Sequence, residues 1–539
     1  MEEFLLKIGG FGRYQGFLMF FVFVTSFTCG SNYYSQVFSL LEPPKTCISD
    51  GLNTQGECLI LSANNDTLEC SNWSYNYSDQ FPTLVSEANW VCEQDIRPQI
   101  ISTVFWIGNA IGSLIFGISN DLLGRKKTIF ISHLIYLIGT IMTLFLTQVY
   151  TFQLLARLLV GVSHHTISHL PYLLAIEFCT EKTRVVPLLI VMISYSLSSI
   201  ILPILSAFYI QHWTHLVYFS ISLISLNILI IPLLPESLSW LACTRNKDQF
   251  IKVFHYIGNI NGYDKENNEV SNNIISEYFK ENERTKESVK RRSLLDLTMF
   301  KRLFFNCSVI TFVCCSCFMC YYGHVQNTAN LGSSIYFNFI YGALVEIGAW
   351  IAPFIINRLG RRYIISSLLL LSGFSSISFG FTPDNAQLLK LCIALAGRIF
   401  ITGAYFISLL YASEIFPTEI RGKGMAICEF IGGFGIIFSP SIIYLSKYGN
   451  SIPIMIFGVI SIMAGLMSCC LPETANHKLA QTMEDGNIFG NNQRILPWIK
   501  NSSNKEFLRI AKILGHLNST NNLKTKPVIN SNILINIDL

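Results

Sequence analysis

Two copies of one short motif decide the fold of this chain: Gly117-Ile118-Ser119-Asn120-Asp121-Leu122-Leu123-Gly124-Arg125-Lys126-Lys127 and, much later, Asn357-Arg358-Leu359-Gly360-Arg361-Arg362. In each copy a glycine precedes a run of basic residues, and an apolar run long enough to span a membrane lies on either side. Basic residues gather in the short cytoplasmic turns between membrane helices. The repetition therefore indicates a membrane protein built from two like parts.

Two further signatures recur in the same order in both parts. One is a glutamate with an arginine seven residues later, and the other is Pro-Glu-Ser or Pro-Glu-Thr. In chain order they are Glu177 with Arg184, 235–237, Glu414 with Arg421, and 472–474. Chance explains one such pair but not three, so the sequence predicts six plus six spans.

The composition supports this interpretation. Hydrophobic residues make up 51% of the 539 residues and charged residues only 13%, about half the ~25% that is usual in soluble proteins. The mean hydropathy is +0.43. So few charges cannot cover a large soluble surface, and so apolar a chain is not disordered. Most of the surface is therefore expected to face lipid.

Twelve apolar runs are long enough to cross a bilayer, because about 20 helical residues span its core of about 30 Å. They lie at 17–40, 99–120, 129–148, 151–178, 186–210, 214–234, 303–323, 335–357, 363–382, 388–413, 424–446 and 452–471. The runs lack the alternation of barrel strands, which predicts an all-α membrane protein. The first run is too long for a secretory signal and lacks a small-residue cleavage site.

The basic residues predict the orientation. With the N-terminus in the cytoplasm, 32 of the 38 Lys and Arg residues fall on the cytoplasmic side, as the positive-inside rule favours. Both termini are therefore predicted to be cytoplasmic. The expected divisions are a cytoplasmic N-terminus (1–16), a first six-helix half (17–234), a cytoplasmic linker (235–302), a second six-helix half (303–471) and a cytoplasmic, largely disordered tail (472–539).

Residues 41–98 are expected to form one long extracellular loop, with nine acidic and two basic residues. Four cysteines predict two disulfides in an oxidising compartment, with three pairings possible: Cys47, Cys58, Cys70 and Cys92. Three sequons predict N-glycosylation, at Asn65, Asn72 and Asn76. Three other sequons are expected to face the cytoplasm or its edge and to stay unmodified, at Asn306, Asn501 and Asn518.

These motifs resemble those of the major facilitator superfamily, whose loop between spans two and three carries Gly-x-x-x-Asp-Arg-x-Gly-Arg-Arg/Lys. Within it the chain is similar to the organic ion transporters of solute carrier family 22, which share the large glycosylated, cysteine-bearing first outer loop. Other matching residues are Gly12-Arg13-Tyr14-Gln15, Tyr321-Tyr322-Gly323, Asn330-Leu331-Gly332, Leu344-Val345-Glu346-Ile347 and Glu414-Ile415-Phe416-Pro417-Thr418-Glu419-Ile420-Arg421. The resemblance implies a major facilitator fold of twelve helices in two six-helix halves.

The recurring charged residues are predicted to form rim ion pairs that hold the cytoplasmic end shut and release when the halves rock. The candidates are Asp121, Arg125, Glu177, Arg184 and Glu236 in the first half and Arg361, Arg362, Glu414, Arg421 and Glu473 in the second. Anchoring at the membrane surface is the alternative role, expected of the lysines. Three positions lose a charge of the family pattern, Leu122, Asn357 and Ser239. Either this weakens the latch between the halves or the remaining pairs suffice.

Charged residues within spans are costly and usually face a cavity. Glu346 resembles the cavity glutamate of the organic cation transporters and is a candidate substrate contact, with a hydrogen bond between helices as the alternative. Gly433 stands where cation transporters of the family carry Asp and anion transporters Arg. Glu429, one turn earlier on the same face, either supplies a negative charge or lies at the cytoplasmic rim.

The fourth apolar run contains three histidines. His165, His169 and Tyr172 share one helix face, and His165 matches a cavity lysine of the cation transporters. His165 and Tyr172 are candidates for the cavity lining, with ordinary helix packing as the alternative. Two histidines at this spacing can bind a metal, but no third ligand is evident, so no metal site is expected. Tyr321 and Tyr322 either line the pathway or belong to an interfacial aromatic belt.

The sequence therefore predicts a secondary active or facilitative transporter of small organic ions, with cations or zwitterions favoured, that works by alternating access. A sugar porter of the same superfamily and a transport-dead membrane sensor are the alternatives. The chain carries no P-loop, HExxH or GxSxG motif, so neither an enzyme nor an ATP-driven pump is expected. The expected setting is the lipid bilayer of the plasma membrane, with a monomeric functional unit, no nucleic-acid partner and no cofactor.

Overall fold

The computed structural model divides the chain into a compact unit, Met1–Asn491, and a C-terminal unit, Asn492–Leu539. The structure describes residues 2–7, 9–48, 54–55, 58–61, 67–70, 72–78, 80–145, 147, 149–180, 183, 185–262, 275, 279, 294–328, 331, 335–349, 360–383, 385–417, 420–475, 480, 482–490 and 493. All contacts below lie within the compact unit.

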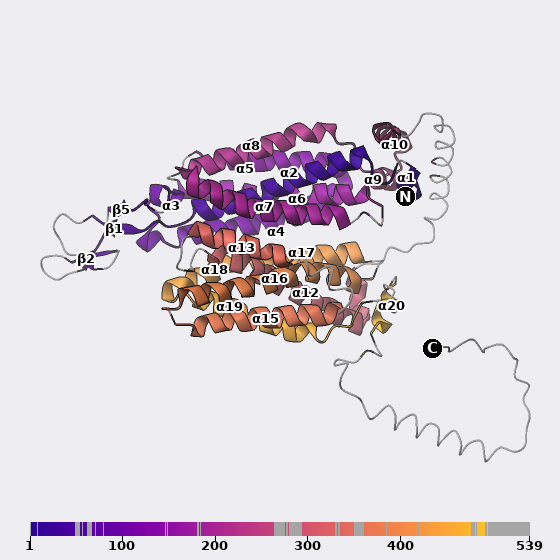
Figure 1. Cartoon of the computed structure of the whole chain (residues 1–539). Coiled ribbons are helices and arrows are strands. Elements are labelled where there is room, and N and C mark those ends of the chain that lie inside the picture. The colour runs from indigo at the N-terminus through magenta and orange to yellow at the C-terminus, as the bar shows by residue number, and fades with distance from the viewer. Residues whose placement is uncertain are drawn as a thin grey trace, which may run out of the picture. The chain divides into compact units, whose positions relative to one another are not determined.

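Long helices in two bundles make up most of the compact unit (Figure 1). The first half contains α2 (Arg13–Ser39), α4 (Arg97–Leu123), α5 (Arg125–Met142), α6 (Tyr150–Glu177), α7 (Val185–Phe208) and α8 (Trp213–Ile230). The second half contains α12 (Lys301–Asn327), α13 (Ile335–Ala349), α15 (Arg361–Phe381), α16 (Gln387–Ile415), α17 (Arg421–Ile437), α18 (Ser439–Tyr444) and α19 (Ile452–Ser468). Every apolar run of the sequence overlaps at least one of these helices.

Many of these helices suit a membrane. Among the described residues, eight segments are long and apolar enough to cross one: Arg13–Ser39, Cys92–Leu123, Val186–Phe208, Trp213–Leu233, Lys301–Asn327, Arg361–Phe381, Gln387–Ile415 and Arg421–Tyr448. Two shorter apolar helices accompany them, Ile335–Gly348 and Ile452–Ser468. The chain is thus a mostly helical, multi-pass membrane protein.

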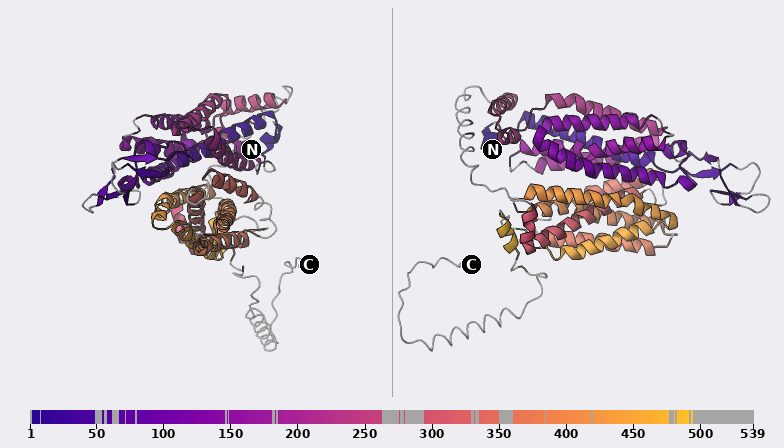
Figure 2. Two further views of the ribbon diagram at one scale, coloured as in Figure 1. Left: turned by 60° about the vertical axis from the view of Figure 1, so that its left-hand side comes forward. Right: turned by 180° about the vertical axis from the view of Figure 1, so that it is seen from behind.

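The two bundles lie side by side (Figure 2). They meet where α4 and α7 of the first half contact α17 and α13 of the second. Within the first half, α4 and α6 approach until their backbones touch. A Cβ at Gly112 would overlap the carbonyl oxygen of Val162, and a Cβ at Gly161 would overlap that of Phe105. Small residues at helix crossings allow this close packing in membrane bundles. It holds α6 in place against α4, and α6 carries several of the predicted cavity residues.

Shorter elements lie at the two ends of the bundle, which we call the α3 end and the α10 end (Figure 1). The α10 end carries α1 (Glu2–Lys7), α9 (Leu238–Cys243), α10 (Lys247–Asn261) and α20 (Met483–Ile488). The α3 end carries α3 (Leu84–Glu87), η1 (Cys92–Gln94), the antiparallel pair β1 (Lys45–Cys47) and β5 (Trp73–Tyr75), and the antiparallel sheet β2 (Thr54–Gln55), β3 (Leu59–Leu61) and β4 (Thr67–Glu69).

The prediction of an all-α protein is therefore wrong for residues 41–98, where short strands form. The disulfides are Cys47–Cys70 and Cys58–Cys92, one of the three pairings that the sequence left open. These cross-links hold chain segments together that are too short to build a hydrophobic core of their own.

The first part of the tail contains the short helix α20. Thr482 and Asp485 form a reciprocal cap at the start of α20, each side chain accepting from the other's backbone N–H at 3.2 Å. Asn487 Oδ1 accepts a hydrogen bond from the backbone N–H of Arg302 at 3.2 Å. α20 therefore packs against the start of α12.

Candidate functional site

One face of α6 carries His165, His169 and Tyr172. The imidazoles of His165 and His169 stack with ring centroids 4.9 Å apart, and the ring of Tyr172 lies 6.2 Å from that of His169. Asn109 Oδ1 of α4 accepts a hydrogen bond from the backbone N–H of His165 at 3.2 Å. All three side chains on this face are half-buried. The face therefore borders accessible space and is not packed core.

Glu429 of α17 lies opposite this face. Its Oε1 is 3.7 Å from Nε2 of His169, and the ligand atoms of Glu429, His165 and His169 all lie within 4.8 Å of one another. The sequence revealed no third metal ligand beside the two histidines, and the structure corrects this. The reason is tertiary, since α17 belongs to the other half of the molecule.

The depth of Glu429 also follows from the helix ends. Glu429 lies eight residues after Arg421, where α17 begins, and His169 lies eight residues before Glu177, where α6 ends. At about 1.5 Å per residue, both lie about 12 Å inside the α10 end. Glu429 is therefore within the bundle and not at its rim.

An aromatic cluster, defined as Tyr33, Trp106, Tyr321, Tyr322 and Tyr405, joins the two halves. The ring of Tyr322 lies 5.6 Å from that of Tyr33 on α2 and 4.7 Å from that of Trp106 on α4. The ring of Tyr321 stacks on that of Tyr405 of α16 at 4.8 Å. The two predicted tyrosines of α12 thus pack between helices and not in a belt at a helix end. Tyr33, Trp106 and Tyr405 were not predicted as site residues from the sequence.

Buried polar atoms without partners accompany this cluster on α2 and α4. Asn32 Oδ1, Gln36 Oε1 and Trp106 Nε1 are buried, and none of the described residues hydrogen-bonds to them. Buried polar groups are nearly always hydrogen-bonded, so these atoms retain the capacity to hydrogen-bond to water or a ligand. The polar run 31–36 inside an otherwise apolar span is the sequence signal that could have indicated this site, and it was not used.

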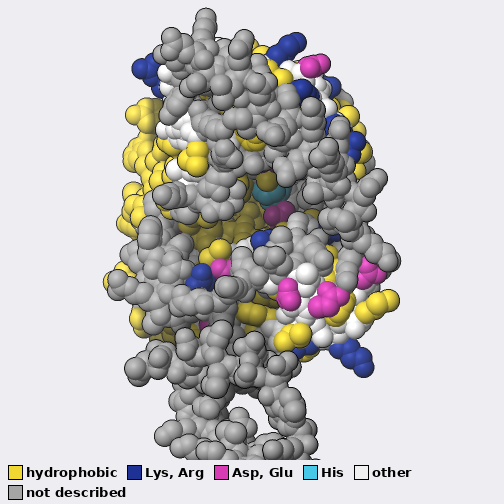
Figure 3. Space-filling model, turned by 90° about the vertical axis from the view of Figure 1, so that its right-hand side faces the viewer, with side chains coloured by type: hydrophobic (Ala, Val, Ile, Leu, Met, Phe, Trp, Pro, Cys, Tyr) yellow, Lys and Arg dark blue, Asp and Glu magenta, His cyan; other side chains and the backbone are white. Residues whose placement is uncertain are grey.

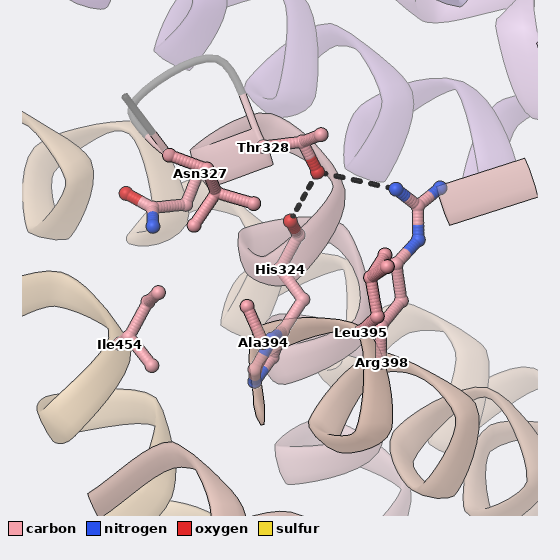
Figure 4. A pocket seen from close by; sticks show the side chains of 8 residues that line it. His324, Asn327, Thr328, Ala394, Leu395, Arg398 and Ile454 are labelled. Atoms are coloured by element: carbon pink, nitrogen blue, oxygen red, sulfur yellow. Dashed lines mark hydrogen bonds between the residues drawn. The ribbon is translucent and has the colours of Figure 1, made fainter. Parts of the chain in front are cut away.

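Glu346 of α13 is buried and paired. Arg398 of α16 donates from Nη2 and Nε to Glu346 Oε1 at 2.7 and 2.9 Å, and both side chains are 3% exposed. Arg398 Nη1 also donates to Thr328 Oγ1 at 3.1 Å (Figure 4). This is the tie between helices that the sequence analysis considered as the alternative to a substrate contact. The pocket beside it, lined by His324 and Arg398 among others, has room for about one water molecule.

Gly433 is buried at a contact between the halves. A Cβ at Gly433 would lie 3.5 Å from the Cβ of Ala110 on α4, an ordinary packing distance. Gly433 therefore allows α17 to pack closely against α4. It carries no charge, and the nearby charged residue of α17 is Glu429.

A charge network follows the first copy of the opening motif, at the α10 end. Gly124 has φ +94°, which turns the chain sharply from α4 into α5. Glu236 Oε1 accepts the backbone N–H of Arg125 at 2.8 Å and so caps α5. The guanidinium of Arg125 contacts Glu177 Oε1 at 2.9 Å and Asp121 Oδ1 at 3.4 Å.

The second copy builds the same network. Gly360 has φ +90°, and Glu473 accepts the backbone N–H groups of Arg361 and Arg362 at 2.8 and 3.1 Å. The guanidinium of Arg361 contacts Glu414 Oε2 at 3.1 Å. Each residue here corresponds to one in the first network, as expected of an internal duplication.

In this structure the side chains of Arg125 and Arg361 form their ion pairs within their own halves and not across them. Each arginine contacts a glutamate at the end of a helix of its own half, because α5 packs on α6 and α15 packs on α16. Arg421 Nε donates to the carbonyl of Phe416 at 3.4 Å. Arg184 lies outside the described residues, as does Asn357.

A charged contact does join the halves at the α3 end. Asp95, just before α4, accepts from Lys447 Nζ at 2.6 Å and from Tyr444 Oη at 2.9 Å. We call these three residues the α3-end contact. The sequence signal was slight, since Lys447 is one of the few basic residues expected outside the cytoplasm.

Two of the predicted glycosylation sites lie in the described part of the loop. Asn72 and Asn76 are exposed, while Asn65 is outside the described residues. Exposure leaves both amides accessible to modification.

The chain folds into two bundles of apolar helices, and each bundle carries a copy of the same charge network. The bundles meet around a polar and aromatic interior. This arrangement is that of a transporter of the major facilitator type. The chain belongs to the sugar (and other) transporter family, whose family model matches residues 60–485. This confirms the superfamily that the sequence motifs resembled.

Individual proteins narrow the comparison. The chain is 26% identical over 533 residues to the organic cation transporter-like protein of Drosophila melanogaster, covering 91% of this chain and 93% of that protein. It is 27% identical over 420 residues to solute carrier family 22 member 6 of Mus musculus, covering 77% and 75%. The fold matches the partially occluded inward open conformation of the xylose transporter XylE from E. coli with a TM-score of 0.60 at 14% identity, covering 86% and 100%.

Proposed function

We propose that the chain transports small organic ions across the plasma membrane, as a secondary active or facilitative transporter that favours cations. The observation that carries this proposal is the aromatic cluster between the halves with a carboxylate nearby. Aromatic faces attract organic cations, and the attraction grows when water is excluded. Trp106 of the cluster and Asn109, which contacts His165, lie one turn apart on α4. The cluster and the Glu429 region are therefore neighbours along one helix.

The charges favour a cation over an anion. Arg398 neutralises Glu346, so this glutamate adds no net charge to the interior. Glu429 has a histidine, His169, as its ion-pair partner. No Lys or Arg side chain forms an ion pair with Glu429 among the described contacts, and its side chain is 23% exposed, so the carboxylate remains accessible to a substrate. A relative named as an organic cation transporter-like protein supports the preference for a cation.

An alternating-access cycle fits the distribution of contacts. The α3-end contact ties the halves together at one end, whereas Arg125 and Arg361 at the other end pair within their own halves. Figure 3 views the α10 end and has a hollow between the two bundles, with a histidine and an acidic side chain inside it. The structure thus corresponds to a state closed at the α3 end and open at the α10 end.

The membrane topology belongs to the same proposal. We place twelve spans in the bilayer, both termini and the α10 end in the cytoplasm, and the α3 end outside. The 32 basic residues on the proposed cytoplasmic side and the paired cysteines on the other support this orientation. Removal of N-glycans should then shift the gel mobility of the wild type, and Asn72→Gln with Asn76→Gln should reduce that shift. A shift that persists in a variant lacking Asn65, Asn72 and Asn76 would contradict the topology.

Uptake of labelled cations, zwitterions, anions and sugars into oocytes tests the substrate class. We expect a small organic cation to accumulate above uninjected controls and Glu429→Gln to reduce this uptake by at least tenfold. Accumulation of a sugar alone would favour the porter alternative, in which Asn32 and Gln36 serve as hydrogen-bonding groups. No accumulation from any panel, with normal surface expression, would favour the transport-dead sensor.

A further inference from the structure

We call His165, His169 and Glu429 the histidine–glutamate group. The proposed transport uses the charge of Glu429 but does not require all three side chains together. Their ligand atoms lie within 4.8 Å of one another, and His169 Nε2 and Glu429 Oε1 are 3.7 Å apart. His165 and His169 are one helical turn apart on α6, so their spacing is held by the helix itself.

This set of donors has the chemistry of a transition-metal site. Imidazole nitrogen and carboxylate oxygen bind Zn²⁺ at about 2.0–2.2 Å, and sites with two histidines and one glutamate leave a fourth position for water. A tetrahedral ion with such bonds holds its ligand atoms about 3.3–3.5 Å apart. The 3.7 Å between His169 Nε2 and Glu429 Oε1 is already close to this value. Ligand atoms as much as 4.8 Å apart reach it when each of the two atoms moves by about 0.7 Å through side-chain rotation.

The surroundings also suit a metal. The His169 and Glu429 side chains are 35% and 23% exposed, so they are neither sealed in the core nor free on the surface. The carboxylate of Glu429 compensates part of the charge of a divalent ion. Lys and Arg side chains contribute no ion pair to these three residues among the described contacts.

We propose that the histidine–glutamate group binds a divalent transition metal of the zinc class and that the bound metal ties the two halves together. Two ligands belong to α6 of the first half and one belongs to α17 of the second. Alternating access requires these halves to move relative to one another. A metal bound to both therefore holds the observed conformation and inhibits transport. The inhibition rests on the proposed transport function, whereas the binding does not.

Binding is tested first, without transport. The full-length protein is purified in detergent and titrated with Zn²⁺ against a chromophoric chelator. We expect one Zn²⁺ per chain, with affinity at least tenfold lower in His165→Ala, His169→Ala and Glu429→Gln. The matched control is His215→Ala, which removes an exposed histidine of α8 away from the group and should bind as the wild type does.

Two results would overturn the metal site. One is wild-type affinity in monodisperse Glu429→Gln, since the third ligand would then be irrelevant. The other is His169→Cys binding Cd²⁺ no more tightly than His169→Ala does, because a thiolate at a true ligand position favours the softer ion. The cysteine variant keeps a ligand at this position and so separates lost binding from lost folding.

The tie between the halves is tested in proteoliposomes with the best cation of the uptake panel. Zn²⁺ at ten times its measured dissociation constant should lower wild-type uptake at least fivefold. The same Zn²⁺ concentration should not change the uptake by His165→Ala from its own zinc-free value. Full uptake with the site occupied would overturn the tie. Failure of every panel substrate would instead contradict the proposed transport function, and the titration would still decide whether the metal binds.

Discussion

At the scale of single residues, the buried pair of Glu346 and Arg398 carries the largest energetic consequence. Removing one partner of a buried ion pair costs about 3–5 kcal/mol, because the remaining charge is left without compensation. We expect Glu346→Ala to lower the thermal unfolding temperature of the detergent-purified protein and the double variant with Arg398→Ala to recover part of the loss. Wild-type unfolding combined with weakened cation uptake would instead make Glu346 a substrate contact.

Tyr322 tests the aromatic cluster at the same scale, since it contacts both Tyr33 and Trp106. A cation–π contact contributes about 0.5–2 kcal/mol, so Tyr322→Ala should raise the KM for cation uptake about 2- to 30-fold. Tyr322→Phe keeps the ring and should stay within about twofold of the wild type. Tyr218→Ala, on the exposed face of α8, is the control. An equal loss in the phenylalanine variant would mean that the hydroxyl, and not the ring face, binds the substrate.

At the scale of elements, the turn from α4 into α5 depends on a glycine. Gly124 has φ +94°, and a Cβ there would lie 2.6 Å from the Glu236 carboxylate that caps α5. Gly124→Ala should therefore cost about 1–3 kcal/mol of stability, measured by thermal unfolding. Gly117→Ala is the matched control. Gly117 lies in α4, and no atom lies within 4 Å of a Cβ added there. Equal unfolding temperatures for both variants would show that the cap tolerates displacement.

At the scale of the whole molecule, the α3-end contact sets the balance between the two conformations. Lys447 is 52% exposed, and such an ion pair is worth about 0–1 kcal/mol. Lys447→Ala should thus raise the population open at the α3 end by up to about fivefold. The measurement is the rate at which an impermeant maleimide labels Gln36→Cys on intact cells. Exchanging the charges, Asp95→Lys with Lys447→Asp, should return the rate toward the starting value. Labelling that is equally fast in all three proteins would rule out a closing role for this contact.

The sequence by itself determined the class of protein and the places of its helices. Lipid requires uninterrupted apolar runs, and the positive-inside rule concentrates basic residues in the intervening turns, so both signals lie in consecutive residues. The repeated Gly-Arg motifs likewise marked Arg125 and Arg361 as members of equivalent networks. The short strands of the outer loop escaped prediction because disulfides, and not periodicity, hold them.

Only the tertiary structure decided which of these residues meet. It gave Glu346 an arginine partner, kept Arg125 and Arg361 within their own halves, and brought Glu429 to His169. Spacing along one helix shows which side chains share a face, but not which helix faces them. That choice depends on how each helix is rotated and crossed against its neighbours, which is set by packing between residues far apart in the chain.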